Sequence, residues 1–327
     1  MLTQNALPEP AVRRFADDFL RLTGAGEKAR LGIAVSGGPD SLALLLLAAA
    51  AFPGCVEAAT VNHSLRPASA DEALFVASLC AARGISHSIL TLNGLPPGNV
   101  SAQARIARYE ALDRWLVAQA IDWLLTGHHA NDQLETMIMR LNRGSGVTGL
   151  SGVRAKQGRI IRPLLHWRRE DLAALVADAG IIAVNDPTNR DDAFDRARLR
   201  KSLHDVEWID APAVALSADA LADADTALDW TVDRLEAAHI HQDDAGITFD
   251  RRSAKFPAEL VRRLTLRCLR RIDPSAEPRG VALSRFIATL EMGGAATLGH
   301  VLGQGGDQWH FSPEPPRRPS RQSHNPQ

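Results

Sequence analysis

The chain has 327 residues, of which 45% are hydrophobic and 23% are charged, and its formal net charge at pH 7 is −1. This composition is ordinary for a globular protein, and no run of about 18 apolar residues is present that could cross a membrane. A net charge so close to zero gives no sign of a nucleic-acid-binding protein. Because one hydrophobic core rarely organises so many residues, we expect two domains.

Three cysteines, Cys55, Cys80 and Cys268, are widely spaced along the chain. They form no Cys-x-x-Cys motif, so we expect them to pack as small apolar side chains rather than to form disulfides. Residues 1–10 lack the basic and apolar pattern of a secretion signal. We therefore expect a cytoplasmic protein without a membrane partner.

The first predicted element is an amphipathic helix over residues 8–22, with Phe15 and Phe19 on its apolar face. We expect this helix to cap the first domain. The apolar run of residues 31–35 has the length and β-branched content of a buried strand. The next apolar run, residues 42–51, is rich in leucine and alanine and is therefore expected to be helical.

Between this strand and helix lies the motif Ser36-Gly37-Gly38-Pro39-Asp40-Ser41. A glycine turn in this position directs free backbone N–H groups and the positive end of the helix dipole at one point, where we expect a phosphate. Gly37 and Gly38 let the backbone approach the anion, and Ser36 and Ser41 add hydroxyl donors. The Asp40 carboxylate would repel phosphates unless a cation lay between them, so it indicates Mg²⁺. The alternative is a plain strand-to-helix turn capped by serines.

This motif is neither a Walker A loop nor a G-x-G-x-x-G fingerprint. It resembles the PP-loop, S-G-G-x-D-S, of the ATP pyrophosphatases. Those enzymes split ATP between the α and β phosphates, adenylate an oxygen of the substrate and let a nucleophile displace AMP. The resemblance implies ATP and Mg²⁺ as cofactors, with Mg²⁺ on Asp40.

Strands and helices alternate after the loop. Strands are predicted over residues 56–61, 86–92 and 122–126, and helices over residues 70–83, 101–120 and 131–141. This alternation is typical of an α/β protein with a doubly wound parallel sheet, of the Rossmann-like or HUP type. Ligands of such sheets bind beyond the carboxyl ends of the strands.

Polar clusters follow three of the predicted strands: residues 36–41, residues 62–66 and residues 128–136. Because the carboxyl ends of parallel strands share one edge of a sheet, we expect the three clusters to line one crevice. In the last cluster, Asp132 and Glu135 are three residues apart and share one face of a helix. These carboxylates could hold a cationic substrate, Mg²⁺ or both, or could only stabilise the first turn of the helix. The paired histidines have no third ligand at a recognisable spacing, so zinc is not expected.

Charge is unevenly distributed along the rest of the chain. Residues 154–169 contain six basic and no acidic residues, residues 251–271 contain eight basic residues against Glu259, and residues 205–244 contain eleven acidic residues against Arg234. Such segregation is compatible with a bound polyanion and equally with solvated helix faces. The predicted helix over residues 194–203 carries four basic residues, for which contact with phosphates is favoured.

The segment that joins the two predicted domains carries several weaker signals. Residues 144–149 form a glycine-rich loop with basic neighbours, which could close over a ligand or serve as a plain linker. A last strand is predicted over residues 159–165 and a helix over residues 169–179. Asp186-Pro187-Thr188-Asn189 favours a turn.

The C-terminal third is predicted to be mainly helical. Helices are expected over residues 212–241, 257–271 and 281–290, followed by a glycine-rich region that ends near Phe311. Proline and arginine dominate the end of the chain, which is typical of disorder. We therefore expect a PP-loop catalytic domain over residues 1–210, a helical linker and smaller, mainly helical second domain over residues 211–311, and a disordered tail over residues 312–327.

Seven motifs occur in unbroken order between about residues 28 and 205. They are Ser36–Ser41, Val61–Arg66, Ala104–Tyr109, His128–Thr136, Arg143–Gly146, Arg162–Leu165, and Asp186–Asn189 with Arg196–Arg200. In this combination the chain resembles the tRNA(Ile)-lysidine synthases, a family of cytoplasmic bacterial ligases. A weaker match over Gly293–Leu302 extends the resemblance into the second domain.

The resemblance implies a particular reaction. Members of this family ligate free L-lysine to C2 of the wobble cytidine in the CAU anticodon of tRNA(Ile), which changes codon reading from AUG to AUA and identity from methionine to isoleucine. ATP adenylates the C2 oxygen with release of pyrophosphate, and the ε-amine of lysine then attacks C2 and expels AMP. The implied partners are tRNA(Ile) with a CAU anticodon and free lysine. A homodimer is a possible assembly.

Roles for individual residues also follow from the resemblance. Asp40, His128, Asp132 and Glu135 are implied as catalytic, with Asp132 and Glu135 on the lysine ammonium and either a carboxylate or His128 as the base. The implied cofactor-binding residues are Ser36, Gly37, Gly38, Pro39, Asp40, Ser41, Asn62, His63, Arg108 and Arg200. Arg196, Arg198 and Arg200 are expected near the ATP phosphates or the anticodon loop, whose bases are accessible without duplex opening.

Two departures and three alternatives accompany this interpretation. The family usually has two consecutive aspartates where this chain has Asn131-Asp132, and the acceptor-stem contacts of longer members are not assumed here. A tRNA cytidine thiolase of the same fold normally needs cysteines near the site. An amidotransferase-type synthetase needs a glutaminase domain. A non-catalytic RNA-binding protein with a vestigial nucleotide site would not need Asp40, Asp132 and Glu135.

Overall fold

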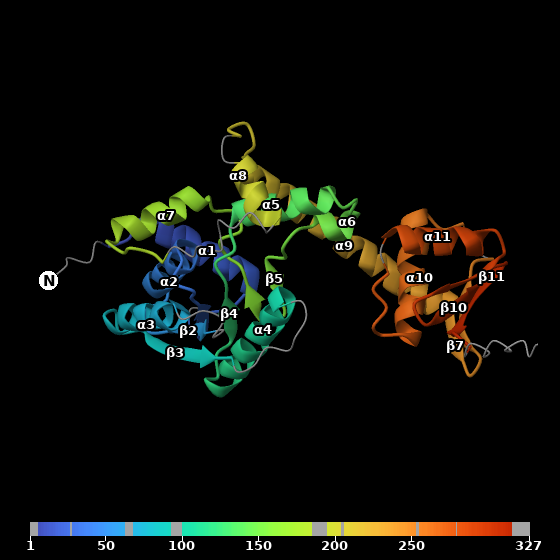
Figure 1. Ribbon diagram of the computed structural model, residues 1–327, viewed down its shortest axis with the longest axis horizontal. Helices are drawn as coiled ribbons and strands as arrows, with labels where there is room; N and C mark the ends of the chain where they lie inside the picture. The colour runs from blue at the N-terminus through green and yellow to red at the C-terminus, as the bar shows by residue number, and fades with distance from the viewer. Residues whose placement is uncertain are drawn as a thin grey trace, which may run out of the picture. The chain divides into compact units, whose positions relative to one another are not determined.

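The computed structural model describes residues 6–26, 28–62, 68–92, 100–184, 195–203, 206–252, 255–278 and 280–315. The chain divides into two compact units, Met1–Ala222 and Asp223–Gln327 (Figure 1). His63, the predicted turn Asp186–Asn189 and most of the predicted tail lie outside the described residues. Within the described ranges, no helix is long and apolar enough to cross a membrane.

A six-stranded sheet with the order β3-β2-β1-β4-β6-β5 forms the centre of the first unit (Figure 1). Its strands are β1 (Leu31–Ala34), β2 (Val56–Asn62), β3 (Ser86–Thr91), β4 (Trp123–Leu125), β5 (Lys156–Gln157) and β6 (Ile160–Ile161). Neighbours from β3 to β6 pair in parallel, whereas β5 pairs antiparallel to β6. The expected α/β class and parallel sheet are confirmed.

Helices cover both faces of this sheet. The helices of the first unit are α1 (Glu9–Thr23), α2 (Pro39–Ala51), α3 (Ala68–Ala81), α4 (Val100–Ala118), α5 (Ala130–Leu141), α6 (Val147–Leu150), α7 (Arg169–Asp178), α8 (Asp195–Leu203) and the start of α9 (Ala211–His239). On one face, a single buried cluster joins α1, α2, α3 and α7 to the strands, and it includes Phe15, Leu45 and Leu172. On the other face, α4 packs through Leu112 and Trp115. The sheet is therefore doubly wound, as expected.

The order of the strands determines where a ligand can bind. β1 lies between β2 and β4, so the sheet reverses its winding direction between β1 and β4. A switch of this kind opens a crevice at the carboxyl ends of the two strands. Residues 36–41 leave β1 and residues 126–130 leave β4, so the topology brings the PP-loop and the start of α5 to the same edge.

Some elements differ from those predicted. Only Ile160–Ile161 forms a strand within the predicted strand of residues 159–165. Pro163 has no N–H for a sheet ladder, which explains the early end of this strand. The glycine-rich loop contains the short helix α6, and the Arg140 guanidinium holds its end by donating to the carbonyl oxygens of Gly149 (2.5 Å) and Gly152 (3.0 Å).

The second unit combines helices with an antiparallel sheet. Its helices are the rest of α9, α10 (Ala258–Ile272) and α11 (Gly280–Glu291), and its sheet has the order β7-β8-β11-β10-β9. The strands are β7 (Ile240–Asp243), β8 (Gly246–Asp250), β9 (Ala295–Leu298), β10 (Val301–Gln304) and β11 (Gln308–Pro313). The three helices agree with the prediction, but the sheet was not predicted. β11 also extends into the segment predicted to be disordered from residue 312.

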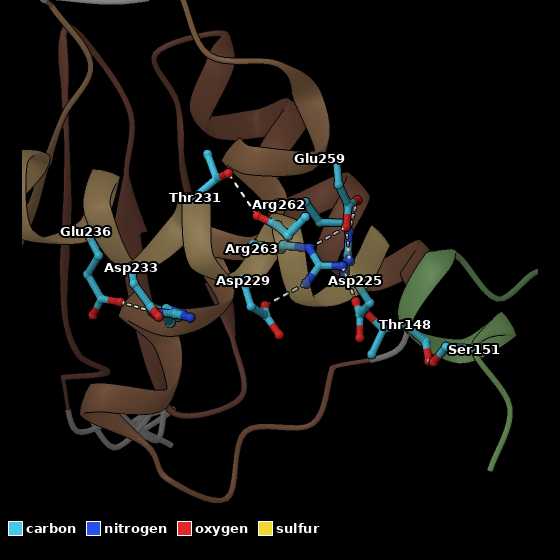
Figure 2. A network of polar contacts seen from close by, with 12 residues as sticks. Thr148, Ser151, Asp225, Asp229, Thr231, Asp233, Glu236, Glu259, Arg262 and Arg263 are labelled. Carbon is cyan, nitrogen blue, oxygen red and sulfur yellow. Dashed lines mark hydrogen bonds and ion pairs between the residues drawn. The ribbon is translucent and has the colours of Figure 1, made fainter. Parts of the chain in front are cut away.

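Acidic residues of α9 pair with arginines of α10 inside the second unit (Figure 2). The Arg263 guanidinium, only 7% exposed, contacts the carboxylates of Asp225 (2.5 Å), Asp229 (2.7 Å) and Glu259 (2.8 Å). Arg267 contacts Asp233 (2.5 Å) and Glu236, and Arg271 also contacts Glu236. The opposite charges of Arg263, Arg267 and Arg271 and of the acidic residues of α9 therefore serve to join the two helices.

Asp225 is buried, with 3% of its surface exposed, and Arg263 pairs with its carboxylate. Arg263→Ala removes this guanidinium, so we expect it to lower the free energy of unfolding of the second unit by about 3–5 kcal/mol. Chemical denaturation of the full chain measures this change. Arg262→Ala is the matched control, since Arg262 pairs with Glu259 where both side chains are about one third exposed. We expect the control to cost about 1 kcal/mol or less, and equal losses in the two variants would contradict the assignment.

Candidate active site

The PP-loop is held in shape by its own hydroxyl groups. Ser41 Oγ donates to the carbonyl oxygen of Gly38 (3.0 Å) and accepts from the backbone N–H of Ser36 (3.1 Å). Gly37 has φ +85°, a left-handed conformation that favours glycine. Gly38 precedes α2 and Pro39 begins it, without a side-chain cap from the described residues. The first N–H groups of α2 therefore stay available for an anion.

A second glycine brings the segment after β4 against this loop. A Cβ atom at Gly127 would lie 3.0 Å from the carbonyl carbon and oxygen of Asp40 and 3.1 Å from the nitrogen of Ser41. Only glycine allows so close an approach without a shift of the backbone. The residues that follow, from His128 to Glu135, are thereby placed beside the PP-loop.

His129 bridges the loop and the first turn of α5. Its side chain is 2% exposed, and its Nε2 atom lies 3.4 Å from Asp40 Oδ2 and 3.6 Å from Asp132 Oδ2. The same Asp132 oxygen accepts a hydrogen bond from the backbone N–H of His129 (3.1 Å). Burial alone would lower the pKa of His129, but the hydrogen bond with Asp40 and the charges of Asp132 and Asp40 raise it above its ordinary value. The imidazole therefore tends toward its charged form, which suits a position between two carboxylates.

Asp132 and Glu135 converge on arginines of α8. Arg196 donates from Nε to Glu135 Oε2 (2.7 Å) and from Nη2 to Asp132 Oδ1 (3.0 Å). Arg200 donates to both oxygens of Glu135, at 2.8 and 3.0 Å. Burial opposes ionisation of Asp132, but the charges of His129 and Arg196 outweigh it and lower the pKa of Asp132. The carboxylate of Asp132 is therefore ionised at neutral pH.

Hydrogen bonds and nearby charges also act on Arg200. Its hydrogen bonds to Glu135 raise its pKa, and the charges of Asp132 and Asp40 add to the effect. The negative charge of Asp40 in the PP-loop therefore acts on Arg200, as do the charges of Asp132 and Glu135 on α5. Arg198, on the same helix, pairs with Asp195 instead and is 60% exposed.

His128 occupies a different environment from its neighbour His129. Its Nδ1 atom lies 3.0 Å from the hydroxyl of Thr126. Burial lowers the pKa of His128 to about 4, and the positive charges of Arg162 and Arg108 add to this effect while Asp132 opposes it. His128 is therefore neutral at physiological pH.

Other residues singled out from the sequence lie around this centre. Asn62 ends β2, and its Oδ1 atom accepts a hydrogen bond from the hydroxyl of Ser69 (3.0 Å). The guanidinium of Arg108 lies 5.2 Å from the ring of Tyr109 on α4. Asn131, at the usual aspartate position, accepts a hydrogen bond from the N–H of Arg169 (3.1 Å) at the start of α7. The side chain of Asn131 thus serves the junction of α5 and α7.

One atom of the PP-loop fits a bound cation. Asp40 Oδ1 is buried and has no hydrogen-bond partner among the described residues. A buried carboxylate oxygen in this condition suits a hard cation such as Mg²⁺. No cluster of three or more His, Cys, Asp or Glu side chains within the described ranges could hold a metal. Mg²⁺ bound by one carboxylate and by substrate phosphates needs no such cluster.

His129 and Arg162 were not singled out as site residues from the sequence. His129 belongs to the polar cluster that follows the predicted strand of residues 122–126, and this position could have marked it as a site residue. Nothing in the sequence, however, distinguished it from His128. Arg162 is 2% exposed and donates to the carbonyl oxygen of Arg154 (2.6 Å). Its influence on His128 comes from packing across the sheet, which no local pattern reveals.

Comparisons with known proteins agree with this geometry. A family model for the PP-loop domain matches residues 11–207. The chain is 40% identical to the tRNA(Ile)-lysidine synthase of Zymomonas mobilis, over 94% of this chain and 96% of that protein. It is 42% identical to the tRNA(Ile)-lysidine synthase of Novosphingobium aromaticivorans, over 95% of this chain and 96% of that protein.

A solved structure shares the fold at low sequence identity. It is the U34-tRNA thiolase NcsA from Methanococcus maripaludis with its 4Fe-4S cluster, with a TM-score of 0.52 and 15% identity over 64% of this chain and 78% of that chain. The doubly wound sheet and the loop after β1 thus define a PP-loop protein. Within that class, the chain belongs to the tRNA(Ile)-lysidine synthase family.

The depressed pKa of His128 predicts a specific dependence of stability on pH. Its pKa is about 4 in the folded chain against an ordinary value of 6.5, so between these values the unfolded chain binds the proton more strongly. The free energy of unfolding should therefore fall as pH falls from about 6.5 toward 4. Urea unfolding across this window should show a smaller loss for His128→Gln than for the wild type, and identical pH profiles would contradict the assignment.

Proposed function

We propose that this protein is an ATP-dependent ligase that joins free L-lysine to C2 of the wobble cytidine in the CAU anticodon of tRNA(Ile). Membership of the lysidine synthase family supports the reaction class. The observation that carries the proposal is the buried bridge of His129, which ties Asp40 of the PP-loop to Asp132 of α5. A phosphate cradle and a pair of carboxylates for an amine are thereby held in one crevice, as a two-step adenylation and transfer requires. The cytoplasm, where tRNA is used, is the proposed location.

In the first step the C2 oxygen of the cytidine attacks the α phosphate of ATP and pyrophosphate leaves. We propose that the N–H groups at the start of α2, which have no side-chain cap among the described residues, and the hydroxyl of Ser36 bind the departing pyrophosphate. Mg²⁺ on Asp40 Oδ1 would neutralise charge that develops on the phosphates. His129 fixes the other oxygen of Asp40, so the carboxylate is oriented before the nucleotide arrives.

In the second step the ε-amine of lysine attacks C2 and AMP leaves. We propose that Asp132 and Glu135 bind the lysine ammonium, since their oxygens converge on one cation in this structure. The amine must lose a proton before it attacks. We propose His128 as the acceptor, because it is neutral at physiological pH. Asp132 and Glu135 are less suited to accept a proton, since guanidinium groups pair with both carboxylates. A pKa of about 4 makes His128 a weak base, and the negative charge of Asp132, which raises the pKa of His128, would favour transfer of the proton to the imidazole.

Further residues outside the PP-loop are proposed to bind ATP or tRNA. Asn62 ends β2 and Arg108 lies on α4, and we propose that they and Arg200 contact ATP. His63 is proposed with them from its position in the sequence. Exposed Arg198 is proposed to face the RNA phosphates.

A tRNA thiolase is the alternative, because a thiolase shares the fold. The positions of the cysteines favour the ligase. Cys55 lies between α2 and β2, Cys80 is buried in α3, and Cys268 is buried in α10 of the second unit. Burial raises the pKa of Cys80 to about 11 and that of Cys268 to about 12, so neither is a ready thiolate.

The reaction is tested by incubating the protein with a tRNA(Ile) transcript bearing a CAU anticodon, labelled lysine, ATP and Mg²⁺. We expect label in the RNA together with equal amounts of AMP and pyrophosphate. A transcript with a UAU anticodon is the matched control and should stay unlabelled. Absence of label with folded protein and a verified transcript would contradict the proposed function.

Asp40→Ala is expected to lower the rate of AMP formation by about 10²-fold or more, because it removes the proposed Mg²⁺ ligand and the partner of His129. Asp17→Asn, at an exposed carboxylate of α1, is the control and should leave the rate unchanged. The rate is measured from labelled ATP, and far-UV circular dichroism establishes that both variants are folded. Wild-type turnover in Asp40→Ala would remove Asp40 from the mechanism.

A further inference from the structure

Arg196 spans the two carboxylates that are proposed to bind the substrate amine. Its guanidinium reaches Glu135 Oε2 at 2.7 Å and Asp132 Oδ1 at 3.0 Å, and also lies 3.3 Å from the carbonyl oxygen of Asp132. Arg200 also donates to Glu135, to both of its carboxylate oxygens, whereas Arg196 joins Glu135 to Asp132. A substrate cation that touches both carboxylates must therefore take the place of Arg196.

The three side chains differ in how freely they can move. The side chain of Glu135 is 4% exposed and that of Asp132 is 16% exposed, whereas that of Arg196 is 43% exposed. Asp132 is further fixed by the backbone N–H of His129, and Glu135 by two hydrogen bonds from Arg200. The carboxylates are thus a rigid receptor, and Arg196 is a cation on a long side chain with access to solvent.

A cation in this position has a physical reason. Two carboxylates of low exposure that converge on one point favour a shared cation, so Arg196 adds to the pairing of Glu135 with Arg200 when no substrate is present. A second cation cannot bind the same two oxygens while the guanidinium is there, because the two charges would repel each other at close range. One cation must leave before the other arrives.

We propose that Arg196 is an internal competitor that occupies the ammonium subsite and is displaced by the amine of the incoming lysine. This inference rests on the proposed function and names a residue that sets the affinity for the amino acid. Arg196 is a positioning and specificity-determining residue, since a ligand must offer a cation that fits both carboxylates better than the guanidinium does. The displaced side chain remains within the crevice, where phosphates are available as new partners.

Calorimetric titration of the full chain with L-lysine, in the presence of Mg²⁺ and saturating α,β-methylene ATP, tests the exchange. Arg196→Gln should bind lysine about tenfold more tightly than the wild type, which corresponds to about 1.4 kcal/mol. Arg196→Lys keeps a competing cation and should bind with near wild-type affinity. Arg13→Gln removes an exposed arginine of α1 that pairs with Glu9, and it should leave the affinity unchanged.

L-Arginine is a second probe, because Arg196→Gln leaves a space that has held a guanidinium. We expect L-arginine to compete with lysine in Arg196→Gln at concentrations that have no effect on the wild type. Loss of this competition in Arg196→Lys would support the same conclusion. A purely structural role of Arg196 predicts no new arginine binding in any variant.

The outcomes separate this inference from the proposed function. Lysine binding that is unchanged or weaker in folded Arg196→Gln, with normal binding in the wild type, overturns the exchange and leaves the ligase assignment standing. Binding in Arg196→Gln but not in the wild type supports the exchange in its strongest form. Absence of lysine binding in the wild type and in every variant overturns both.

Discussion

The buried contact of His129 with Asp40 and Asp132 is the interaction on which the rest of the site depends. The carboxylates of Asp40, in the first turn of α2, and Asp132, in the first turn of α5, would repel each other if no positive group lay between them. The imidazole of His129, whose pKa these two carboxylates raise, lies between them, and Gly127 allows the segment after β4 to lie against the backbone of Asp40. The PP-loop and the start of α5 are thereby held together, so under the proposed function one crevice would bind both ATP and the amine.

The electrostatics of the site extend from this contact toward α8. Three carboxylates, those of Asp40, Asp132 and Glu135, face the guanidiniums of Arg196 and Arg200 and the imidazole of His129. Asp132 and Glu135 are paired with guanidiniums before substrates bind, which makes a buried cluster of ionised groups tolerable. Under the proposed function, ATP, Mg²⁺ and lysine would each bring charge to this site, and we expect their binding to rearrange the existing ion pairs.

Much of the first unit could be predicted from the sequence because its signals are local. Apolar runs, the glycine turn of residues 36–41 and the polar strand ends gave the parallel sheet and the edge where the site lies. The partner of Glu135 could not be predicted, since Arg196 is 61 residues away and a basic helix does not reveal what it faces. The sheet of the second unit was missed because its strands have only four to six residues and follow one another through tight turns. The charge of α10 was open to two explanations until its pairing with α9 was visible.

A crystal structure of the full chain with Mg²⁺, α,β-methylene ATP and L-lysine tests the central claim most directly, because it shows both substrates in place. The account predicts phosphates on the N–H groups that begin α2, Mg²⁺ on Asp40, and the lysine ammonium between Asp132 and Glu135, with His129 still joining Asp40 to Asp132. Nucleotide bound away from the PP-loop, or lysine bound away from the two carboxylates, would contradict it.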